Sequence, residues 1–176
     1  MADLEGRVAI VTGGASFVGE AIGAALVGAG ATVVLADRDV ERGSSAAARL
    51  GGAARFVATD IADDAQLDRL VAAAVGEAGR LDVLVSAAAV FDDDRLDSSR
   101  ELWHRALDIN LVSAAVLTRK AAAHMGRGGA IVYVASVSGR TSMFAGTGRP
   151  AANRIVGATS MMLAFVRTAP SLMSCP

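Results

Sequence analysis

Two glycines and one acidic residue have the spacing of a nucleotide-binding site. Gly13 directly follows a β-branched run, and Gly19 lies at the start of an apolar helical stretch. Gly13 would allow a tight turn, Gly19 close packing of the helix, and the free N–H groups at the helix start would face a pyrophosphate. Asp37 ends the next β-branched run, about 20 residues on, where an acid can bond the hydroxyls of the adenosine ribose. We therefore predict a dinucleotide site, against the simpler alternative of an ordinary glycine turn beside a surface aspartate.

The end of this second run also indicates which dinucleotide binds. A carboxylate at Asp37 would repel a 2′-phosphate, so the pattern favours NAD over NADP. Arg38 follows immediately and weakens that preference. We expect NAD as the cofactor.

The elements that must position these residues follow from hydrophobic patterning. Expected strands are Val8–Thr12, Thr32–Ala36, Ala54–Ala58, Val83–Ala87 and Ala130–Ala135. Expected helices are Val18–Ala29, Val40–Leu50, Ala65–Ala78, Ser99–Met125 and Pro150–Val166. Apolar runs without alternation suit strands that are buried on both faces, and strict β–α alternation implies right-handed crossovers. The sequence therefore predicts an α/β fold, a Rossmann-type doubly wound parallel sheet of about five strands in the order 3-2-1-4-5, with helices on both faces.

Composition excludes several classes of protein. Apolar residues make up 53% of the 176-residue chain, which rules out disorder, and a net charge of −1 leaves no electrostatic footprint for nucleic acid. No apolar run reaches the ~18 residues of a membrane span, and no signal peptide is visible. The lone Cys175 suits a reducing compartment. We expect one cytoplasmic domain, residues 1–176 with an atypical last segment at 167–176, that binds neither nucleic acid nor membrane.

Several motifs together resemble the short-chain dehydrogenase/reductase family, in its short single-domain branch, from about Gly6 to Ala164. TGGASFVG (Thr12–Gly19) is similar to the family's T-G-x-x-x-G-x-G, with Phe17 in place of the middle glycine. The extended branch has T-G-x-x-G-x-x-G, often with Phe at this place, and against that pattern Ser16 is the departure. The middle glycine normally keeps a Cβ away from the phosphates. We expect Phe17 to weaken binding without abolishing it, provided that its ring turns away.

The resemblance implies further contacts to the cofactor. ATDIAD resembles the segment whose acid contacts adenine, which implies Asp60 and Ile61 at this place. LDVLVSAAAV resembles L-D-x-L-V-N-N-A-G, although Ser86, Ala87 and Ala89 replace both Asn and the Gly. The implied cofactor-binding residues are Gly13, Ser16, Phe17, Val18, Gly19, Asp37, Arg38, Asp60, Ile61, Ala87 and Ala88.

The same resemblance implies catalytic positions in the second half of the chain. The family's catalytic Ser, which polarises the carbonyl, corresponds to Ser136, and its Asn, which holds a water of the proton relay, corresponds to Asn110. A strand-end hydroxyl and a helix Asn bonded to backbone are the structural alternatives. The family's Tyr-x-x-x-Lys pair falls on RPAAN, where Arg149 stands at the Tyr place and Asn153 at the Lys place.

No Tyr-x-x-x-Lys can be written anywhere in these 176 residues, because Tyr133 is the sole tyrosine and the sole lysine, Lys120, precedes it. A phenol with a pKa of about 10 can be tuned toward neutrality by a neighbouring cation, whereas a guanidinium does not titrate in proteins. Arg149 could therefore polarise a carbonyl but not exchange a proton. By resemblance we expect an NAD(H)-dependent oxidoreductase for an alcohol/carbonyl pair, with impaired or absent catalysis. The alternative is a non-catalytic dinucleotide-binding or assembly protein, or an incomplete gene product.

Residue spacing does not favour a metal site. His104 and His124 both fall on the long expected helix and are too far apart to ligate one ion. Four acids cluster in FDDDRLD at 91–97, where a solvated loop is the better interpretation than a divalent-cation site. Small-molecule carbonyl or alcohol substrates are the partners that the resemblance implies if the chain is active.

Assembly is a further expectation. The strand Ala130–Ala135 would have no neighbour on its outer side, and its apolar residues lack the charge or proline that protects an edge. The last ten residues, RTAPSLMSCP, show no further strand pattern and resemble a truncated terminus. In the family, the helices that match Ser99–Met125 and Pro150–Val166 pack across a dimer interface. We therefore expect a homo-oligomer.

Overall fold

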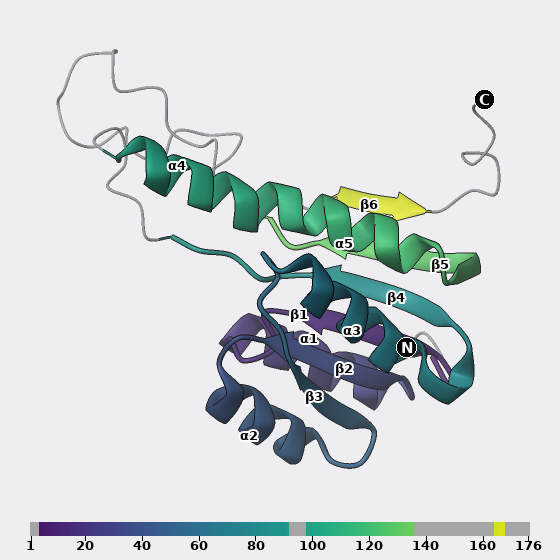
Figure 1. Cartoon of the computed structure of the whole chain (residues 1–176). Coiled ribbons are helices and arrows are strands. Elements are labelled where there is room, and N and C mark those ends of the chain that lie inside the picture. The colour runs from purple at the N-terminus through teal and green to yellow at the C-terminus, as the bar shows by residue number, and fades with distance from the viewer. Residues whose placement is uncertain (1–3, 92–97, 136–163, 168–176) are drawn as a thin grey trace, which may run out of the picture.

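The computed structural model describes residues 4–91, 98–135 and 164–167 and centres on a six-stranded sheet in the order β3-β2-β1-β4-β5-β6 (Figure 1). The strands are β1 Val8–Thr12, β2 Thr32–Asp37, β3 Ala54–Ala58, β4 Leu81–Ser86, β5 Met125–Tyr133 and β6 Ala164–Arg167. The first five strands pair in parallel. The predicted doubly wound sheet with the order 3-2-1-4-5 is therefore confirmed, and β6 adds a sixth strand to it.

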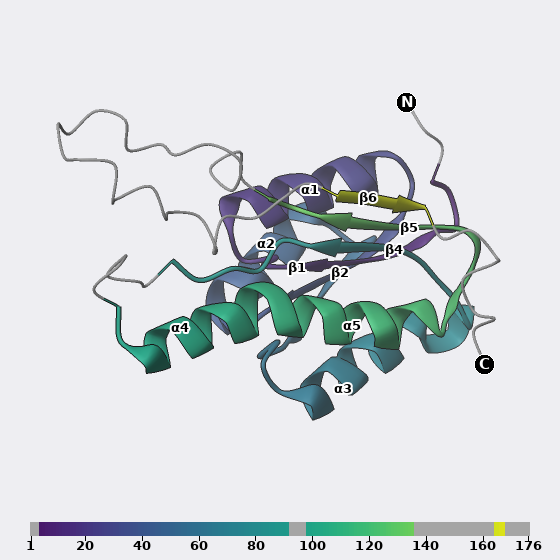
Figure 2. The same cartoon turned by 90° about the horizontal axis from the view of Figure 1, so that it is seen from above.

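Helices cover both faces of this sheet. They are α1 Phe17–Gly28, α2 Val40–Leu50, α3 Asp64–Val75 with the 3₁₀ turn η1 Gly76–Ala78, α4 Arg100–Leu107, the π-helical turn η3 Asp108–Val112, and α5 Ser113–Ala122. α1 and α2 pack on one face, and α3 and α5 on the other (Figure 2). Among the described residues, no helix is both long and apolar enough to cross a lipid bilayer.

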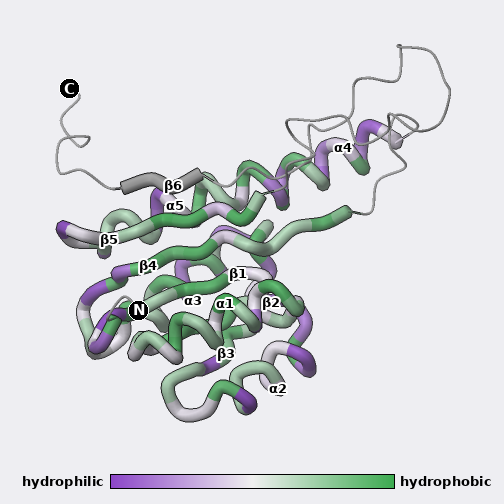
Figure 3. Tube along the Cα trace, turned by 180° about the vertical axis from the view of Figure 1, so that it is seen from behind, coloured by the Kyte–Doolittle hydropathy of each residue, from purple (hydrophilic) through white to green (hydrophobic). Residues whose placement is uncertain are grey.

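The central strand β1 shows why the patterning predicted burial on both faces. All five of its residues are buried. Val8 and Ile10 belong to the core under α3 and α5, whereas Ala9 and Val11 belong to the core under α1 and α2. Side chains of a strand alternate between faces, so both sets must be apolar when helices lie on both sides. Figure 3 shows that β1 and β4 are hydrophobic along most of their length, whereas α2 and α4 carry hydrophilic segments.

The long helix expected at Ser99–Met125 is wrong in two respects. It is interrupted by η3, where the Ser113 amide reaches back to the Asp108 carbonyl instead of keeping the α-helical spacing, although α4, η3 and α5 still run as one rod (Figure 1). It also ends at Ala122, so His124 lies beyond the helix and Met125 already opens β5. Hydrophobic periodicity does not register a single wide turn, because that turn leaves the apolar face nearly continuous.

The C-terminal prediction was also wrong where the structure describes it. Ala164–Arg167, which overlaps the last three residues of the helix expected at Pro150–Val166, forms β6. This strand pairs antiparallel with β5, with Ala164 opposite Tyr133 and Arg167 opposite Ala130. A short apolar run fits a strand as well as a buried helix, and the backbone groups along β5 offer it hydrogen bonds. The expected open edge at β5 is therefore covered over these residues, and this argument for an oligomer is lost.

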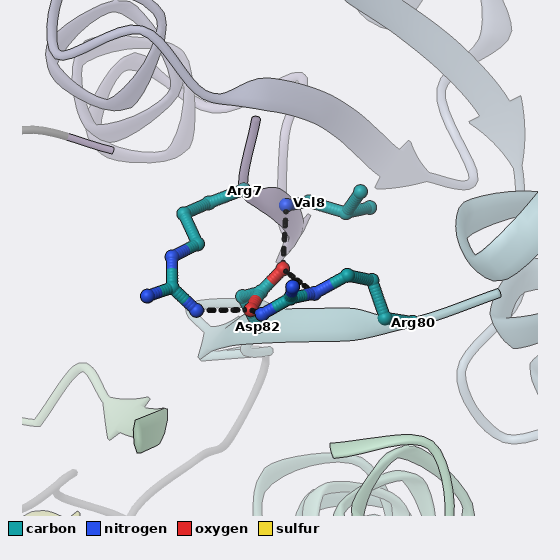
Figure 4. Close-up of polar contacts among 4 residues, drawn as sticks. All are labelled: Arg7, Val8, Arg80 and Asp82. Carbon is teal, nitrogen blue, oxygen red and sulfur yellow. Dashed lines mark hydrogen bonds and ion pairs between the residues drawn. The ribbon is translucent and has the colours of Figure 1, made fainter. Parts of the chain in front are cut away.

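A buried carboxylate ties the sheet together at the amino ends of β1 and β4, away from the glycine turn (Figure 4). Asp82 accepts hydrogen bonds from the Val8 amide at 3.0 Å, from Arg7 at 2.7 Å and from Arg80. Burial by itself raises the pKa of the Asp82 carboxyl, but the bonds from Arg80, Arg7 and Val8 outweigh it, so the pKa lies below its ordinary value. This carboxylate is therefore a structural ion-pair centre at the opposite ends of the strands from the predicted nucleotide site.

Candidate functional site

The glycine turn lies at the carboxyl ends of β1 and β4, where open α/β sheets bind ligands. Gly13 has φ +70°, and a Cβ on it would lie 2.8 Å from the Ala87 carbonyl oxygen. The buried Thr12 hydroxyl accepts hydrogen bonds from the Ala87 amide at 3.1 Å and the Ala88 amide at 3.3 Å. Gly13 is therefore required both for the backbone conformation and for the close approach of two strand ends.

Ser16 closes the turn and leaves two amides open. Its hydroxyl donates to the Gly13 carbonyl at 2.7 Å and accepts from the Gly19 amide at 3.0 Å, and its carbonyl accepts from Glu20 at 2.9 Å. Within the described part of the chain, the amides of Phe17 and Val18 have no acceptor. They belong to the first turn of α1, where the helix dipole favours an anion. This arrangement can receive a phosphate.

Gly19 is fixed by packing. A Cβ at this position would overlap the Gly13 carbonyl oxygen and the backbone of the turn. Phe17, in contrast, is 90% exposed, and it is absent from the residues that line the adjacent cleft. Its ring therefore does not fill the space that a dinucleotide would occupy.

Asp37 lies where β2 meets this turn. One carboxylate oxygen accepts from the Ala15 amide at 3.0 Å, and the other accepts from the Asp39 amide at 3.1 Å. Its carbonyl accepts from the Thr59 amide at 2.8 Å, which joins the ends of β2 and β3. Arg38 is exposed beside it and also lines the cleft.

Asp60 lies in the turn between β3 and α3. Its carboxylate accepts from the Ala62 amide at 3.0 Å, and its own amide donates to the Gln66 side chain at 2.9 Å. Asp63 caps α3, and hydrogen bonds from Gln66 lower the pKa of the Asp63 carboxyl. The turn is thus held by local bonds, with Asp60 and Ile61 both on the cleft.

A cleft of about 360 Å³ joins these segments. Its lining is Gly13, Ser16, Val18, Ala36, Asp37, Arg38, Thr59, Asp60, Ile61, Ala87, Ala88, Ala89, Val90, Phe91, Ile109, Val134 and Ala135. All the predicted cofactor-binding residues line it except Phe17 and Gly19. The charged groups gather at the ends of β2 and β3, whereas the wall beyond β4 and β5 is apolar.

The residues missed by sequence reasoning belong mostly to this apolar wall. They are Ala36, Thr59, Ala89, Val90, Phe91, Ile109, Val134 and Ala135. Most of them lie within five residues after the end of a strand, which is the one signal that could have found them, since the carboxyl ends of parallel strands meet at one edge. Ile109 carries no such signal, because only the packing of η3 brings it there.

Asn110 holds this wall in place. Its amide oxygen accepts from the Val90 amide at 2.8 Å, and its amide nitrogen donates to the Val90 carbonyl at 3.0 Å. The side chain thereby joins η3 to the segment after β4. These bonds correspond to the structural alternative for Asn110, an Asn bonded to backbone.

The other predicted catalytic positions, Ser136, Arg149 and Asn153, lie outside the described residues, as do all four acids of the cluster at 91–97. Tyr133 is described: its hydroxyl lies 2.5 Å from the Thr118 hydroxyl, and it does not line the cleft. No group of three or more potential metal ligands occurs within the described ranges.

Comparison with known proteins gives a consistent result. Residues 7–163 match the family model described as short chain dehydrogenase. The chain is 38% identical over 141 residues to a sorbitol dehydrogenase of Cereibacter sphaeroides and 37% identical over 141 residues to a galactitol 2-dehydrogenase of Agrobacterium fabrum. In each case the match covers 78% of this chain and 55% of the relative, so the chain spans about half the length of these relatives.

A solved structure shows the same similarity in three dimensions. A short-chain type dehydrogenase/reductase from Mycobacterium ulcerans superposes with a TM-score of 0.72 at 30% identity. The superposition covers 78% of this chain and 54% of that protein.

Proposed function

The chain belongs to the short-chain dehydrogenase family, and from that premise we propose that its cleft binds NAD(H) while turnover of an alcohol/carbonyl pair is low or absent. The observation that carries the proposal is the contrast within the cleft. Polar groups converge at its Asp37 end, and its far wall, as described, bears no titratable side chain.

The residues present suit an adenine dinucleotide. The amides of Phe17 and Val18 are oriented by Ser16 for the pyrophosphate, and Gly13 leaves room that a Cβ would fill. Asp37 would accept from the ribose hydroxyls and repel a 2′-phosphate, which favours NAD over NADP. Asp60 and Ile61 would contact adenine. When bound, the nicotinamide would supply a hydride acceptor or donor.

Proton exchange with the substrate is the weak step. Tyr133 is held by Thr118 away from the cleft, and Lys120 pairs with Asp68 between α5 and α3. Neither side chain is therefore placed to act on a substrate. The remaining substitute, Arg149, has a guanidinium that does not titrate. Among the described residues, the far wall of the cleft bears no titratable side chain, so protonation or deprotonation of the substrate oxygen there would be inefficient.

The test is calorimetric titration with NAD and NADP, followed by a dehydrogenase assay on the same sample. The polyols named for the relatives, sorbitol and galactitol, are the first substrates to try. We expect tighter binding of NAD than of NADP and little NADH formation. Preference for NADP would contradict the role of Asp37, and robust NADH formation with a substrate would contradict the low turnover.

A non-catalytic dinucleotide-binding protein is the second candidate function. The apolar far wall favours it, since such a wall can contact a ligand without offering an acid or a base.

Self-association is compatible with either candidate function. Leu111 and Val112 are 61% and 49% exposed on η3, and burying them between two copies would stabilise a homo-oligomer. Light scattering at low micromolar concentration tests this, and a stable monomer would contradict it.

A further inference from the structure

The Asp37 carboxylate already accepts two backbone hydrogen bonds, which contact with a ribose alone would not require. Its two carboxylate oxygens accept from the Ala15 and Asp39 amides at 3.0 and 3.1 Å. Ala15 belongs to the glycine turn, and Asp39 is the N-cap of α2. A single side chain thus joins the turn that would hold the pyrophosphate to the start of the next helix.

A second contact strengthens the same junction. The Gly14 amide donates to the Ala36 carbonyl at 3.1 Å, one residue before Asp37. The turn is therefore anchored to the end of β2 at two successive residues, Gly14 through backbone and Ala15 through the Asp37 side chain. Only the second anchor can be removed by substitution of a side chain.

We propose that Asp37 is a positioning residue for the glycine turn as well as the acceptor for the adenosine ribose. Its carboxylate presents the turn so that the Phe17 and Val18 amides face the pyrophosphate. The inference rests on the proposed function, since it assigns Asp37 a second task at the same site.

The chemistry of a carboxylate allows both tasks at once. Its two oxygens offer about four acceptor positions. The Ala15 and Asp39 amides occupy two of them, which leaves two for a ribose diol. Loss of the carboxylate would leave the part-buried Ala15 amide without its partner, and the turn would then reorganise to satisfy it.

The experiment separates the two tasks with a ligand that lacks the ribose hydroxyls. Wild type, Asp37→Ala and Asp37→Asn are titrated with ADP and with 2′,3′-dideoxy-ADP. Hydrogen exchange of the Ala15 and Asp39 amides is measured by NMR in the same proteins without ligand. Asp39→Ala is the matched control, because the Asp39 carboxylate accepts from the Arg42 amide and makes no contact with the glycine turn.

If Asp37 positions the turn, Asp37→Ala weakens 2′,3′-dideoxy-ADP about tenfold, the equivalent of one lost charge-assisted bond. Exchange of the Ala15 amide rises in Asp37→Ala and stays unchanged in Asp39→Ala. Asp37→Asn keeps one acceptor oxygen for two amides, so at least one of the Ala15 and Asp39 amides exchanges faster, but less so than in Asp37→Ala.

The outcomes distinguish this inference from the proposed function. Unchanged affinity for 2′,3′-dideoxy-ADP in Asp37→Ala, or unchanged exchange of both amides in Asp37→Asn, overturns the positioning role and leaves NAD binding intact. If wild type binds neither ADP nor NAD, the proposed function fails, and the exchange measurements alone decide the positioning role. Should Asp37→Ala not fold, Asp37→Asn supplies both readouts.

Discussion

The two halves of the cleft are held by different kinds of interaction. At the Asp37 half, backbone amides and short polar side chains form a connected set of bonds around the glycine turn. At the far half, the wall is apolar, and the Thr12 and Asn110 side chains bond it to neighbouring elements. The difference teaches that one site can contain two halves with separate structural supports. The Asp37 half is built largely from backbone groups, so its geometry does not depend on the side chains of the far wall.

Substitution of Gly19 should give the largest effect, because it disrupts the glycine turn at the Asp37 half of the cleft. The Cβ of Gly19→Ala would overlap the Gly13 carbonyl, so the turn must open, at a cost of about 2–3 kcal/mol in the free energy of unfolding, with loss of NAD binding. Urea unfolding and calorimetry measure both quantities. Gly28→Ala on the same helix is the control, because its Cβ meets nothing within 4 Å. Equal effects of the two variants would contradict this account of the turn.

The Asp82→Asn variant tests whether the free energy of unfolding can change while the affinity of the cleft for NAD stays the same. Asp82→Asn removes a buried charge from between two arginines and should lower the free energy of unfolding by about 2 kcal/mol at pH 7. Because Asp82 lies at the amino ends of the strands, the NAD affinity of the folded variant should match wild type. An affinity change as large as that in Gly19→Ala would show that the two ends of the sheet are coupled.

Asp82 also makes the free energy of unfolding depend on pH. The pKa of Asp82 is lowered in the folded protein, so its contribution is present above the ordinary aspartate pKa of about 3.9 and is lost as pH falls through the lower folded value. Urea midpoints between pH 7 and pH 3 should therefore drop more steeply in wild type than in Asp82→Asn below about pH 4. If the urea midpoints of the two proteins fell in parallel with pH, the Asp82 carboxyl would have the same pKa in the folded and the unfolded state.

Asn110 tests the apolar half. Asn110→Ala leaves the Val90 amide and carbonyl without their partner and should lower the free energy of unfolding by about 1–2 kcal/mol. NAD affinity should fall while ADP affinity is kept, since only the far wall loosens. Asp108→Ala, on the same turn with an exposed side chain, is the control. A parallel loss of ADP affinity would mean that the two halves are not independent.

Phe17 should give the smallest effect. Its ring is 90% exposed, so Phe17→Gly removes little packing and lowers the free energy of unfolding by about 0.5–1 kcal/mol through the backbone entropy of glycine in a helix. NAD binding should stay equal or become stronger, as calorimetry would show. A large loss of affinity would mean that the ring itself contacts the cofactor.

Much of the fold could be predicted from local patterning. The strands β1 and β3 and the helix α2 have the predicted bounds, because an apolar run or an amphipathic stretch between turn residues is a strong local signal. The positions of Gly13 and Asp37 at the ends of β1 and β2 were predictable for the same reason, since a glycine or an acid directly at the end of an apolar run is a local signal. The π turn at Asp108–Val112 and the antiparallel pairing of Ala164–Arg167 were not, because neither changes the periodicity of the chain.

The sequence itself determined the glycine turn and the acid at the end of β2, since residue type there dictates backbone conformation and burial, and the alternation of strands and helices indicated the strand order. Only the tertiary structure decided what Asn110 bonds, where Tyr133 points and how Ala15 meets Asp37. Each of these contacts joins elements that are distant along the chain. Hydrogen bonds of that kind depend on distances that packing sets to within a few tenths of an ångström, and no local pattern of residue types encodes such distances.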